Sequence, residues 1–351
     1  MPNRNRYLAP PAADIDRCRS MLANGSRSFH AASMLLPAAM RPAAIALYAW
    51  CRQADDAIDL APAEQRSRAV DLLLRRLEAL YAGDVLDTPA ERAFAWAVRA
   101  HSIPQDLPHA LIEGFVWDAE VRRYPDIQAL HAYGARVAGS VGAMMSLVMG
   151  ARDAEALARA CDLGVAMQLT NIARDVGEDA RMGRLYLPLD WCEAEGIDAE
   201  AWLRAPTFSP ALGRVVARLL ADAEALYIRA TPGIALLPRT VRPAMHAARL
   251  LYAEIGREVE RRGLDSVSGR AVVPTARKLR LLGNALMDAW DGVPADARAP
   301  LEATRHLVEA AMRGLPDSIP AAEFENRLHW LVDLFTRLER EEQAMLGGKA
   351  G

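Results

Sequence analysis

QLTNIARDVGED, residues 168–179, is the stretch of sequence that decides the fold. At 100° per residue, a helix places four of its polar side chains within about 60° of one another: Gln168, Asn171, Asp175 and Asp179. The stretch and the residues just before it, LGVAM at 163–167, are otherwise largely apolar. A polar stripe on such a helix points inward, because an apolar helix is buried nearly all round. We therefore predict a buried helix with amide and carboxylate oxygens along one face.

A second polar stripe occurs in LYAWCRQADDAID, residues 47–59. Helical geometry again brings four side chains within about 60°: Tyr48, Arg52, Asp55 and Asp59. One Asp-x-x-x-Asp pair alone is more simply interpreted as a solvated helix face with arginine partners. Two pairs, each extended by a polar stripe, favour inward-facing carboxylates. Such carboxylates repel each other and are costly to bury unless they are paired or metal-bound, so we expect a cation between the helices.

The composition of the stripes indicates a hard divalent cation. Neither stripe offers sulfur or histidine, and carboxylate and amide oxygens suit Mg²⁺, with Mn²⁺ as the alternative. Mg²⁺ usually keeps waters and bridges a few carboxylates to substrate phosphates. The stripes therefore predict a diphosphate substrate, whose charge five cationic side chains are available to neutralise: Arg27, Arg52, Arg174, Arg277 and Lys278.

Nearly every long segment shows helical periodicity, and no convincing strand pattern occurs. The 351 residues suffice for one large domain or two modest ones. We predict a single all-α domain over residues 14–286, in which Pro232-Gly233, Pro238 and Pro243 mark a break before the helix that contains Tyr252. Residues 287–351 form an extension that is loop-rich at first and then helical. Its final helix has an apolar seam that packs on the main domain, on a second copy or on a membrane surface: Phe324, Leu328, Leu331, Phe335 and Leu338.

Composition argues against several other classes of protein. A formal net charge of −3 gives no strongly basic face for nucleic acid. The glycines do not follow a strand in the pattern of a nicotinamide-binding fold. No Cys-x-x-Cys pair occurs, so the four cysteines are expected to be reduced thiols of a cytoplasmic protein. We expect no signal peptide, and no apolar run is long enough to span a bilayer.

Five segments resemble the squalene and phytoene synthase family, whose members join prenyl diphosphates head to head. They are GSRSFH (25–30) with LLP (35–37), YAWCRQADDAID (48–59), VAGSVG (137–142), QLTNIARDVGED (168–179) and RLYLP (184–188). The resemblance covers residues 14–286, and its most specific part is the segment 168–179 with the Tyr186-Leu187-Pro188 that follows. Many members have a tyrosine where this chain has Ala135, so the role of that phenol is not carried over.

The resemblance implies an isoprenoid synthase-type helical bundle around a central cavity. Within the family, the chain is most similar to the bacterial members that make phytoene. These condense two geranylgeranyl diphosphates through prephytoene diphosphate, in carotenoid biosynthesis, with Mg²⁺ and without NADPH, and they release diphosphate. A phytoene desaturase would act downstream. The hydrocarbon product also implies a peripheral membrane contact, through the C-terminal helix or through surface helices near the cavity mouth.

The resemblance further implies roles for individual residues. Catalysis falls to Tyr48, Arg52, Asp55, Asp59, Asp175 and Asp179. Metal ligation falls to Asp55, Asp59, Asn171, Asp175 and Asp179. Substrate binding falls to Ser26, Arg27, Ser28, Phe29, Tyr48, Arg52, Gln168, Asn171, Arg174, Tyr252, Arg277 and Lys278. Because water would quench a carbocation, we expect a dry pocket walled by Phe29, Trp50, Met144, Met145, Met149 and Met167, in which Gly139 and Gly142 leave room for the chains.

Three alternatives fit much of the same pattern. A close relative would use C15 farnesyl diphosphate to make dehydrosqualene or presqualene diphosphate, since one residue at the floor of a pocket can decide chain length. An assembly or binding protein would keep the fold without the chemistry, but such a protein should have lost aspartates, and this chain keeps all four. A head-to-tail chain elongator would fit DDAID at 55–59 but not the segment 175–188.

Overall fold

The structure is a computed structural model that describes residues 11–25, 32–84, 86–288 and 298–314. Within these residues the chain is helical and contains no strand, which confirms the all-α prediction. None of the helices among them is long and apolar enough to cross a membrane. The first compact unit of the chain ends at Gly314, and the seam expected over residues 324–338 lies outside the described residues.

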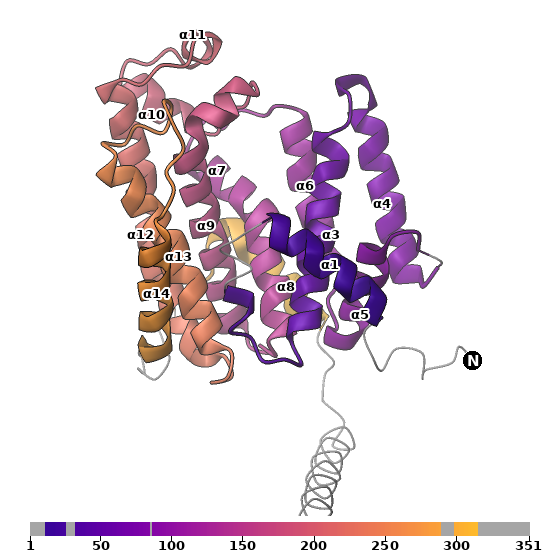
Figure 1. Ribbon diagram of the computed structural model, residues 1–351. Coiled ribbons are helices and arrows are strands. Elements are labelled where there is room, and N and C mark those ends of the chain that lie inside the picture. Colours follow the sequence, from indigo (N-terminus) through magenta and orange to yellow (C-terminus); the bar gives the residue numbers. More distant parts are fainter. Residues whose placement is uncertain (1–10, 26–31, 85, 289–297, 315–351) are drawn as a thin grey trace, which may run out of the picture. The chain divides into compact units, whose positions relative to one another are not determined.

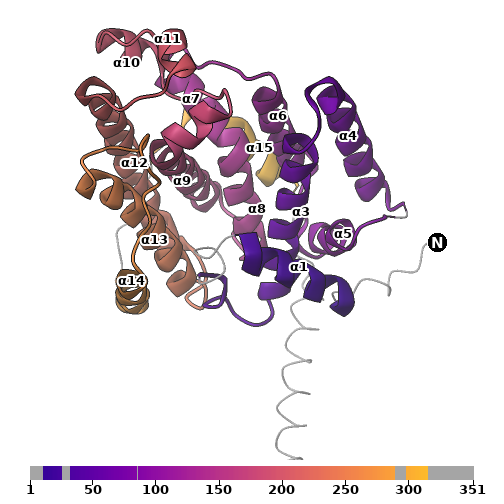
Figure 2. The same ribbon diagram turned by 45° about the horizontal axis from the view of Figure 1, so that its top comes forward.

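The helices of this unit surround a pair of central helices, α8 and α9. In Figures 1 and 2, the N-terminal helices α1 and α3 to α6 gather on one side and α12 to α14 on the other. In chain order, the longer elements are α1 (Ala12–Gly25), α3 (Arg41–Asp59), α4 (Arg66–Ala82), α5 (Pro89–His101), α6 (Asp106–Ala119), α7 (Ile127–Gly134), the π-helical turn η3 (Ala135–Gly139), α8 (Ser140–Val148), α9 (Ala154–Arg181), α10 (Leu189–Ala194), α11 (Ala199–Arg204), α12 (Pro210–Leu236), α13 (Arg242–Arg261), α14 (Thr275–Asp288) and α15 (Arg305–Arg313).

The two helices predicted from the polar stripes are α3 and α9. α3 starts with Pro42 in its first turn, where a missing backbone donor costs nothing. α9 starts at an N-cap, where the Asp153 carboxylate accepts from the Ala156 N–H at 2.8 Å. The stripe residues of α9 are all half-buried, whereas on α3 Tyr48 and Asp55 are half-buried and Arg52 and Asp59 are exposed. The inward-facing interpretation therefore fits α9 along its stripe and α3 only in part.

Two glycines let α9 lie directly against α8 and the turn before it. A Cβ on Gly164 would overlap the carbonyl oxygen of Ala138, and one on Gly142 would overlap that of Ala160. Side chains at these positions would push the helices apart, so both glycines serve helix packing. Ala138 belongs to η3, and π-helical turns are frequent at functional sites.

The predicted break before the helix with Tyr252 lies between Leu236, the end of α12, and Arg242, the start of α13, and contains Pro238. Only its Pro232-Gly233 part is wrong, because α12 continues through that dipeptide. Pro232 cannot donate to the carbonyl of Ile228, but Ile228 lies on the exposed side of the helix, where losing one hydrogen bond costs least. A Cβ on Gly233 would overlap the side chain of Arg159 on α9. The dipeptide thus marks a close helix crossing instead of a helix end.

A buried charge cluster holds the segment that begins at residue 298. Arg159 and Asp162, both fully buried on α9, form an ion pair at 3.1 Å, and Arg229 of α12 pairs with Asp162 at 2.8 Å. Both arginines also donate to backbone carbonyls of residues 298 and 299. The start of this segment is therefore fixed to α9 and α12.

α15 follows in a stretch where the sequence analysis expected loops. It packs against α6, α8 and α9 and buries Leu307 completely. A Cβ on Gly139 would lie 3.3 Å from Leu307. Gly139 therefore accommodates α15, and the space that was expected to serve a substrate is filled by this helix.

Candidate active site

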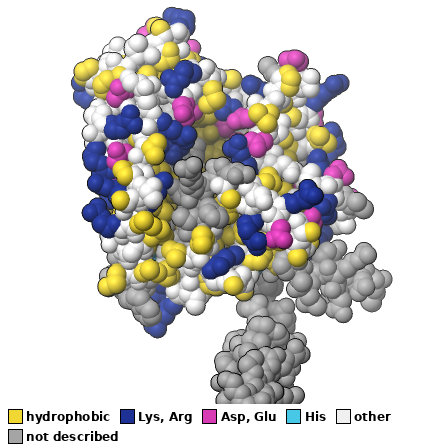
Figure 3. Space-filling model, in the orientation of Figure 1, with side chains coloured by type: hydrophobic (Ala, Val, Ile, Leu, Met, Phe, Trp, Pro, Cys, Tyr) yellow, Lys and Arg dark blue, Asp and Glu magenta, His cyan; other side chains and the backbone are white. Residues whose placement is uncertain are grey.

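A cavity of about 290 Å³ lies between α3, α8, α9 and α13. Most of its wall is apolar, and the polar side chains that reach it are Tyr48, Gln168, Asn171 and Tyr252. On the face shown in Figure 3, acidic and basic side chains gather around a central hollow. The apolar lining consists of Leu47, Cys51, Val137, Ala138, Val141, Gly142, Met145, Ala160, Leu163, Gly164, Met167, Met245 and Ala248.

Both aspartate pairs lie at the same end of this cavity. On α3, Cys51 is the last lining residue and Asp55 follows one turn later; on α9, Asn171 is the last and Asp175 follows one turn later. One turn advances about 5.4 Å along the axis. Arg184 interacts with a member of each pair, which brings the two pairs together. An apolar chain in the cavity would thus leave an anionic head group beside the carboxylates.

Arg52 neutralises only part of the charge on α3. Its guanidinium lies 3.3 Å from the carboxylate of Asp55 and 2.7 Å from that of Asp56. Burial and the nearby Asp59 nevertheless raise the pKa of Asp55 to about 6, against the opposing effect of Arg52. The first pair therefore carries more negative charge than its arginine compensates.

Arg184 joins the loop after α9 to the first aspartate pair. Its guanidinium contacts the Asp59 carboxylate at 2.5 Å. Two residues further on, the hydroxyl of Tyr186 donates to Asp118 at 2.7 Å. Tyr133 of α7 donates to the other carboxylate oxygen of Asp118 at 2.9 Å. Arg184 and Tyr186 of the RLYLP segment thus each contact a carboxylate at the rim of the site.

Asp175 is paired with two arginines from different parts of the chain. The adjacent Arg174 contacts it at 2.5 Å, and Arg270, from the loop between α13 and α14, contacts it at 2.9 Å. Arg270 also lies 3.5 Å from Glu178. This loop therefore contributes a cation to the second aspartate motif.

Gly177 is where that loop meets α9. The N–H of Gly177 donates to the carbonyl of Ser266 at 3.0 Å, and a Cβ on Gly177 would lie 2.5 Å from the carbonyl oxygen of Val267. The glycine between the two acids of the motif therefore lets the loop approach closely enough for Arg270 to reach Asp175.

Asp179 is the least compensated of the four aspartates. Its carboxylate has no hydrogen-bond or ion-pair partner among the described residues. Burial and the neighbouring Asp175 raise its pKa to about 7, although Arg184 lowers it. A cation bound beside it would relieve this repulsion.

Some residues expected at the site have other surroundings. Arg277 of α14 pairs at 2.8 Å with Glu254, which is only 5% exposed in its side chain and also contacts Arg261 at 2.7 Å. Glu254 also pairs with Arg257 at 3.4 Å, so Arg277 shares this carboxylate with two other arginines. Lys278 follows it on α14 and is half-buried. Ser26, Arg27, Ser28 and Phe29 lie outside the described residues.

The cavity wall matches the sequence expectation only in part. Met145 and Met167 line the cavity, whereas Trp50, Met144 and Met149 are absent from its described lining. Trp50 stacks on Phe94 with ring centroids 4.5 Å apart. It lies about 200° around the helix from Tyr48, so the two side chains cannot share a face. Met144 and Met149 are completely buried in the helix packing.

Three charged residues at the rim were not assigned by the sequence analysis. Arg184 belongs to the RLYLP segment, which carried the family resemblance. It follows Asp179 by five residues and therefore lies just after the end of α9. Asp118 and Arg270 are distant in sequence from both motifs and carry no local signal. Only the tertiary structure brings them to the site.

The donor set at this rim fits a hard divalent cation. Seven carboxylates meet four arginines there: Asp55, Asp56, Asp59, Asp118, Asp175, Glu178 and Asp179 with Arg52, Arg174, Arg184 and Arg270. Oxygen donors without sulfur or imidazole suit Mg²⁺. Within the described part of the chain, no three acidic, histidine or cysteine side chains converge closely enough to hold an ion by themselves. An ion would need further ligands, as Mg²⁺ takes from water and phosphate oxygens.

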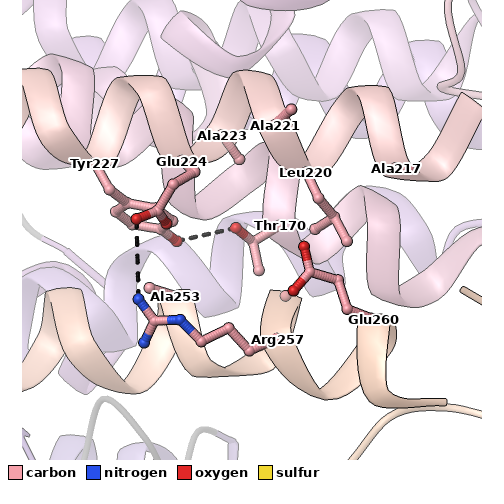
Figure 4. Close-up of a pocket in the computed structure, with 11 residues that line it drawn as sticks. Thr170, Ala217, Leu220, Ala221, Ala223, Glu224, Tyr227, Ala253, Arg257 and Glu260 are labelled. Carbon is pink, nitrogen blue, oxygen red and sulfur yellow. Dashed lines mark hydrogen bonds and ion pairs between the residues drawn. The ribbon is translucent and has the colours of Figure 1, made fainter. Parts of the chain in front are cut away.

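A second hollow, of about 360 Å³, lies between α12 and α13 (Figure 4). At its base the hydroxyls of Tyr227 and Thr170 are hydrogen-bonded at 3.0 Å, and near its mouth Glu224 and Arg257 lie 3.9 Å apart. No member of the two aspartate pairs lines it. Thr170 faces this hollow while the next residue on α9, Asn171, faces the apolar cavity. We therefore assign the chemistry to the apolar cavity.

Comparison with known proteins agrees with this geometry. The profile of the squalene/phytoene synthase family matches residues 22–278, and the chain belongs to that family. A phytoene synthase of Cereibacter sphaeroides is 44% identical over 353 residues, which cover 97% of this chain and 98% of that protein. A phytoene synthase of Rhodobacter capsulatus is 49% identical over 305 residues, covering 85% and 90%. The crystal structure of a dehydrosqualene synthase superposes with a TM-score of 0.73 at 30% identity, covering 79% of this chain and 96% of that one.

Proposed function

We propose that the chain is a phytoene synthase, a prenyltransferase that condenses two geranylgeranyl diphosphates head to head, through prephytoene diphosphate, in carotenoid biosynthesis. The observation that carries this proposal is an apolar cavity with both aspartate pairs at one end. Such a site suits a substrate with a long apolar chain and a diphosphate head. The near full-length similarity to proteins named phytoene synthase supports the C20 substrate.

Each half of the proposed reaction begins with loss of diphosphate from an allylic carbon. Bound Mg²⁺ supplies charge neutralisation to the leaving diphosphate. Arg52 and Arg174 are placed to donate to phosphate oxygens once a cation has taken over their carboxylates. The residues proposed to hold the ions are Asp55, Asp59, Asn171, Asp175 and Asp179.

The apolar wall has the second task of excluding water from the carbocation. Met145 and Met167 suit this wall because their side chains are polarizable and adapt to an irregular ligand. Tyr48 and Tyr252 stand at the polar side of the wall, where burial and, to a lesser extent, Tyr252 raise the pKa of Tyr48. Because the sequence has no nicotinamide fingerprint, the reaction is proposed to end by proton loss, without NADPH.

The test is incubation of the purified protein with geranylgeranyl diphosphate and Mg²⁺ in the absence of NADPH. A C40 hydrocarbon is expected in extracts analysed by mass spectrometry. Asp175→Asn should abolish its formation while the circular dichroism spectrum stays that of a folded helical protein. A wild-type protein that releases no C40 hydrocarbon would contradict the proposal.

A C15 substrate is the second candidate. The solved structure that is 30% identical to this chain is that of a dehydrosqualene synthase, the activity of the C15 alternative. Equal concentrations of the C15 and C20 diphosphates in one reaction distinguish the two functions. A C40 product at several-fold excess over a C30 product is expected, and the reverse ratio would reassign the enzyme.

We further propose a cytoplasmic protein that touches the membrane surface through α14 and passes its product to a phytoene desaturase. Three apolar side chains on this helix, Leu279, Leu286 and Met287, are exposed although its other face is packed on α13. Lys278 and Arg280 flank them, as in helices that lie on anionic lipid surfaces. α13 also lines the cavity, at Ala248, so a membrane contact here would lie beside the substrate site.

Vesicle co-sedimentation tests this contact. Changing Leu279, Leu286 and Met287 together to glutamine should reduce binding to vesicles that contain anionic lipid, and a protein truncated after Gly314 should bind like the full chain. Unchanged binding of the triple variant would refute a role for α14. Loss of binding on truncation would assign the contact to residues 315–351.

A further inference from the structure

Asp118 occupies an unusual environment at the end of α6. Both of its carboxylate oxygens accept hydrogen bonds from phenols, Tyr186 at 2.7 Å and Tyr133 at 2.9 Å. No basic side chain in the described part of the chain forms an ion pair with it. A half-buried carboxylate without a paired cation carries a cost, so its presence calls for a function.

An aromatic cluster fixes the position of this carboxylate. The rings of Tyr124, Tyr133 and Tyr186 pack together with centroid distances between 5.1 and 6.0 Å. The N–H of Leu189 donates to the carbonyl of Tyr124 at 2.9 Å, which ties the loop after α9 to the loop before α7. Asp118 is therefore held by groups from two separate segments and has little freedom to turn away.

Asp118 stands beside the rim of the site, because the Tyr186 that donates to it lies two residues after Arg184, whose guanidinium contacts Asp59 at 2.5 Å. Burial raises the pKa of Asp118 to about 6, while the two phenols and Arg184 lower it and Asp59 raises it further. Burial is the largest cause that raises the pKa of Asp55 and of Asp179, and Asp118 is one of the smaller causes that raise both. One fixed anion thus interacts with a member of each pair and with the arginine that contacts Asp59.

We propose that Asp118 is a positioning residue of the metal–diphosphate site: fixed by Tyr133 and Tyr186, its carboxylate retains Arg184 at the rim and attracts the cation between the two aspartate pairs. This inference rests on the proposed function, because it needs a cation and a diphosphate at that rim.

When a cation binds Asp59, Arg184 loses much of its attraction to that carboxylate. The fixed charge of Asp118 then keeps the guanidinium near a departing phosphate. The phenols occupy both oxygens of Asp118, so it adds negative charge to the site without having to ligate the ion. A fixed negative charge beside a partly buried cation site strengthens binding of the cation appreciably.

Asp118→Asn tests the proposal, because it removes the charge and leaves the shape. We expect the Mg²⁺ concentration for half-maximal rate to rise at least about tenfold, with kcat at saturating Mg²⁺ within about threefold of wild type. Titration of Mg²⁺ with inorganic diphosphate by calorimetry should show the same weakening without any turnover. A purely structural role would lower stability and leave the Mg²⁺ dependence unchanged.

Two further variants make the test decisive. Asp106 lies on the same helix, about 18 Å away by helical rise. It is exposed, and its one ion pair among the described residues is with Arg313 at 3.2 Å, so Asp106→Asn should keep the wild-type Mg²⁺ dependence. Tyr133→Phe combined with Tyr186→Phe keeps the rings but frees the carboxylate, and should also raise the Mg²⁺ requirement. This double variant decides the matter if Asp118→Asn does not fold.

The outcomes separate this inference from the proposed function. If the wild type is active but Asp118→Asn has an unchanged Mg²⁺ dependence, the role of Asp118 alone is overturned. If Asp118→Asn fails to fold, the double phenylalanine variant decides in the same way. A wild type that neither forms a C40 or C30 hydrocarbon nor binds Mg²⁺ with diphosphate overturns both.

Discussion

Replacing Gly177 with alanine should destabilise the protein, although alanine is the better helix former. Within a helix, Gly→Ala is worth up to about 1 kcal/mol in favour of folding. Here the new Cβ would lie 2.5 Å from the carbonyl oxygen of Val267 and 2.7 Å from its Cα, and backbone atoms cannot move aside as a flexible side chain can. Overpacking of this kind costs about 1–3 kcal/mol, and a strained hydrogen bond to Ser266 adds about 1 kcal/mol. We expect a net loss of about 1–3 kcal/mol.

Thermal unfolding followed by circular dichroism, without metal, measures this loss as a decrease of several degrees in Tm. Gly283→Ala is the matched control, because Gly283 is also helical, in α14, and a Cβ there would have no neighbour within 4 Å. That variant should be stabilised by up to about 1 kcal/mol. A second consequence is functional: displacing the loop moves Arg270 away from Asp175, so Gly177→Ala should also need more diphosphate substrate for half-maximal rate.

The reasoning is refuted if Gly177→Ala is as stable as Gly283→Ala. That result would mean that the loop at residues 263–273 can yield without cost. If stability falls but the dependence on substrate is unchanged, then Gly177 serves packing alone, and Arg270 does not act on the substrate through Asp175.

Further predictions concern charge. Because burial raises the pKa of Asp55 to about 6 and of Asp179 to about 7, the folded state holds protons that the unfolded state releases. Their contribution to stability is present in acid and is lost as pH rises through 6 to 7, so the metal-free protein should have a lower Tm at pH 8 than at pH 5.5. Mg²⁺ binding, which needs ionised carboxylates, should strengthen over the same range, and calorimetry that shows no change would contradict this. Arg184→Gln removes a cation that lowers the pKa of Asp179, so the midpoint of that pH dependence should move upward. Asp162→Ala should cost about 3–5 kcal/mol in urea unfolding, because it leaves the buried Arg159 without its carboxylate; a loss below about 1 kcal/mol would show that the cluster is not important for stability.

The helices that carry the site could be predicted because their signal is local. The spacing in residues 47–59 and 168–179 depends only on helical periodicity and on apolar surroundings, and α3 and α9 follow it. Of the residues expected to mark the break before the helix with Tyr252, Pro238 and Pro243 do so, whereas Pro232-Gly233 lies inside α12 for the opposite reason. Whether a proline ends a helix depends on what packs around it, and the crossing with Arg159 is a tertiary contact.

The charged groups around the aspartates were predicted less well. Arg277 was expected near the diphosphate because it is a cation; in the structure it pairs with Glu254, and its role in substrate binding stays a prediction. Arg270 contacts Asp175 across 95 positions of sequence, and nothing in its own surroundings marks it. Asp118 looks from its sequence like an ordinary acid at the end of a helix. Its importance comes from two phenols that lie 15 and 68 positions away.

The placement of the aspartates at the ends of their helices has a further consequence. Asp59 is the last residue of α3, and Asp179 lies in the last turn of α9. The peptide dipoles of a helix leave partial negative charge at this end, so each carboxylate meets an additional repulsion there that positive ions remove. The metal-free protein therefore stores electrostatic strain at its site. Binding of divalent cations without substrate should remove this repulsion and raise the Tm. The Tm therefore measures how fully the site is occupied by cations.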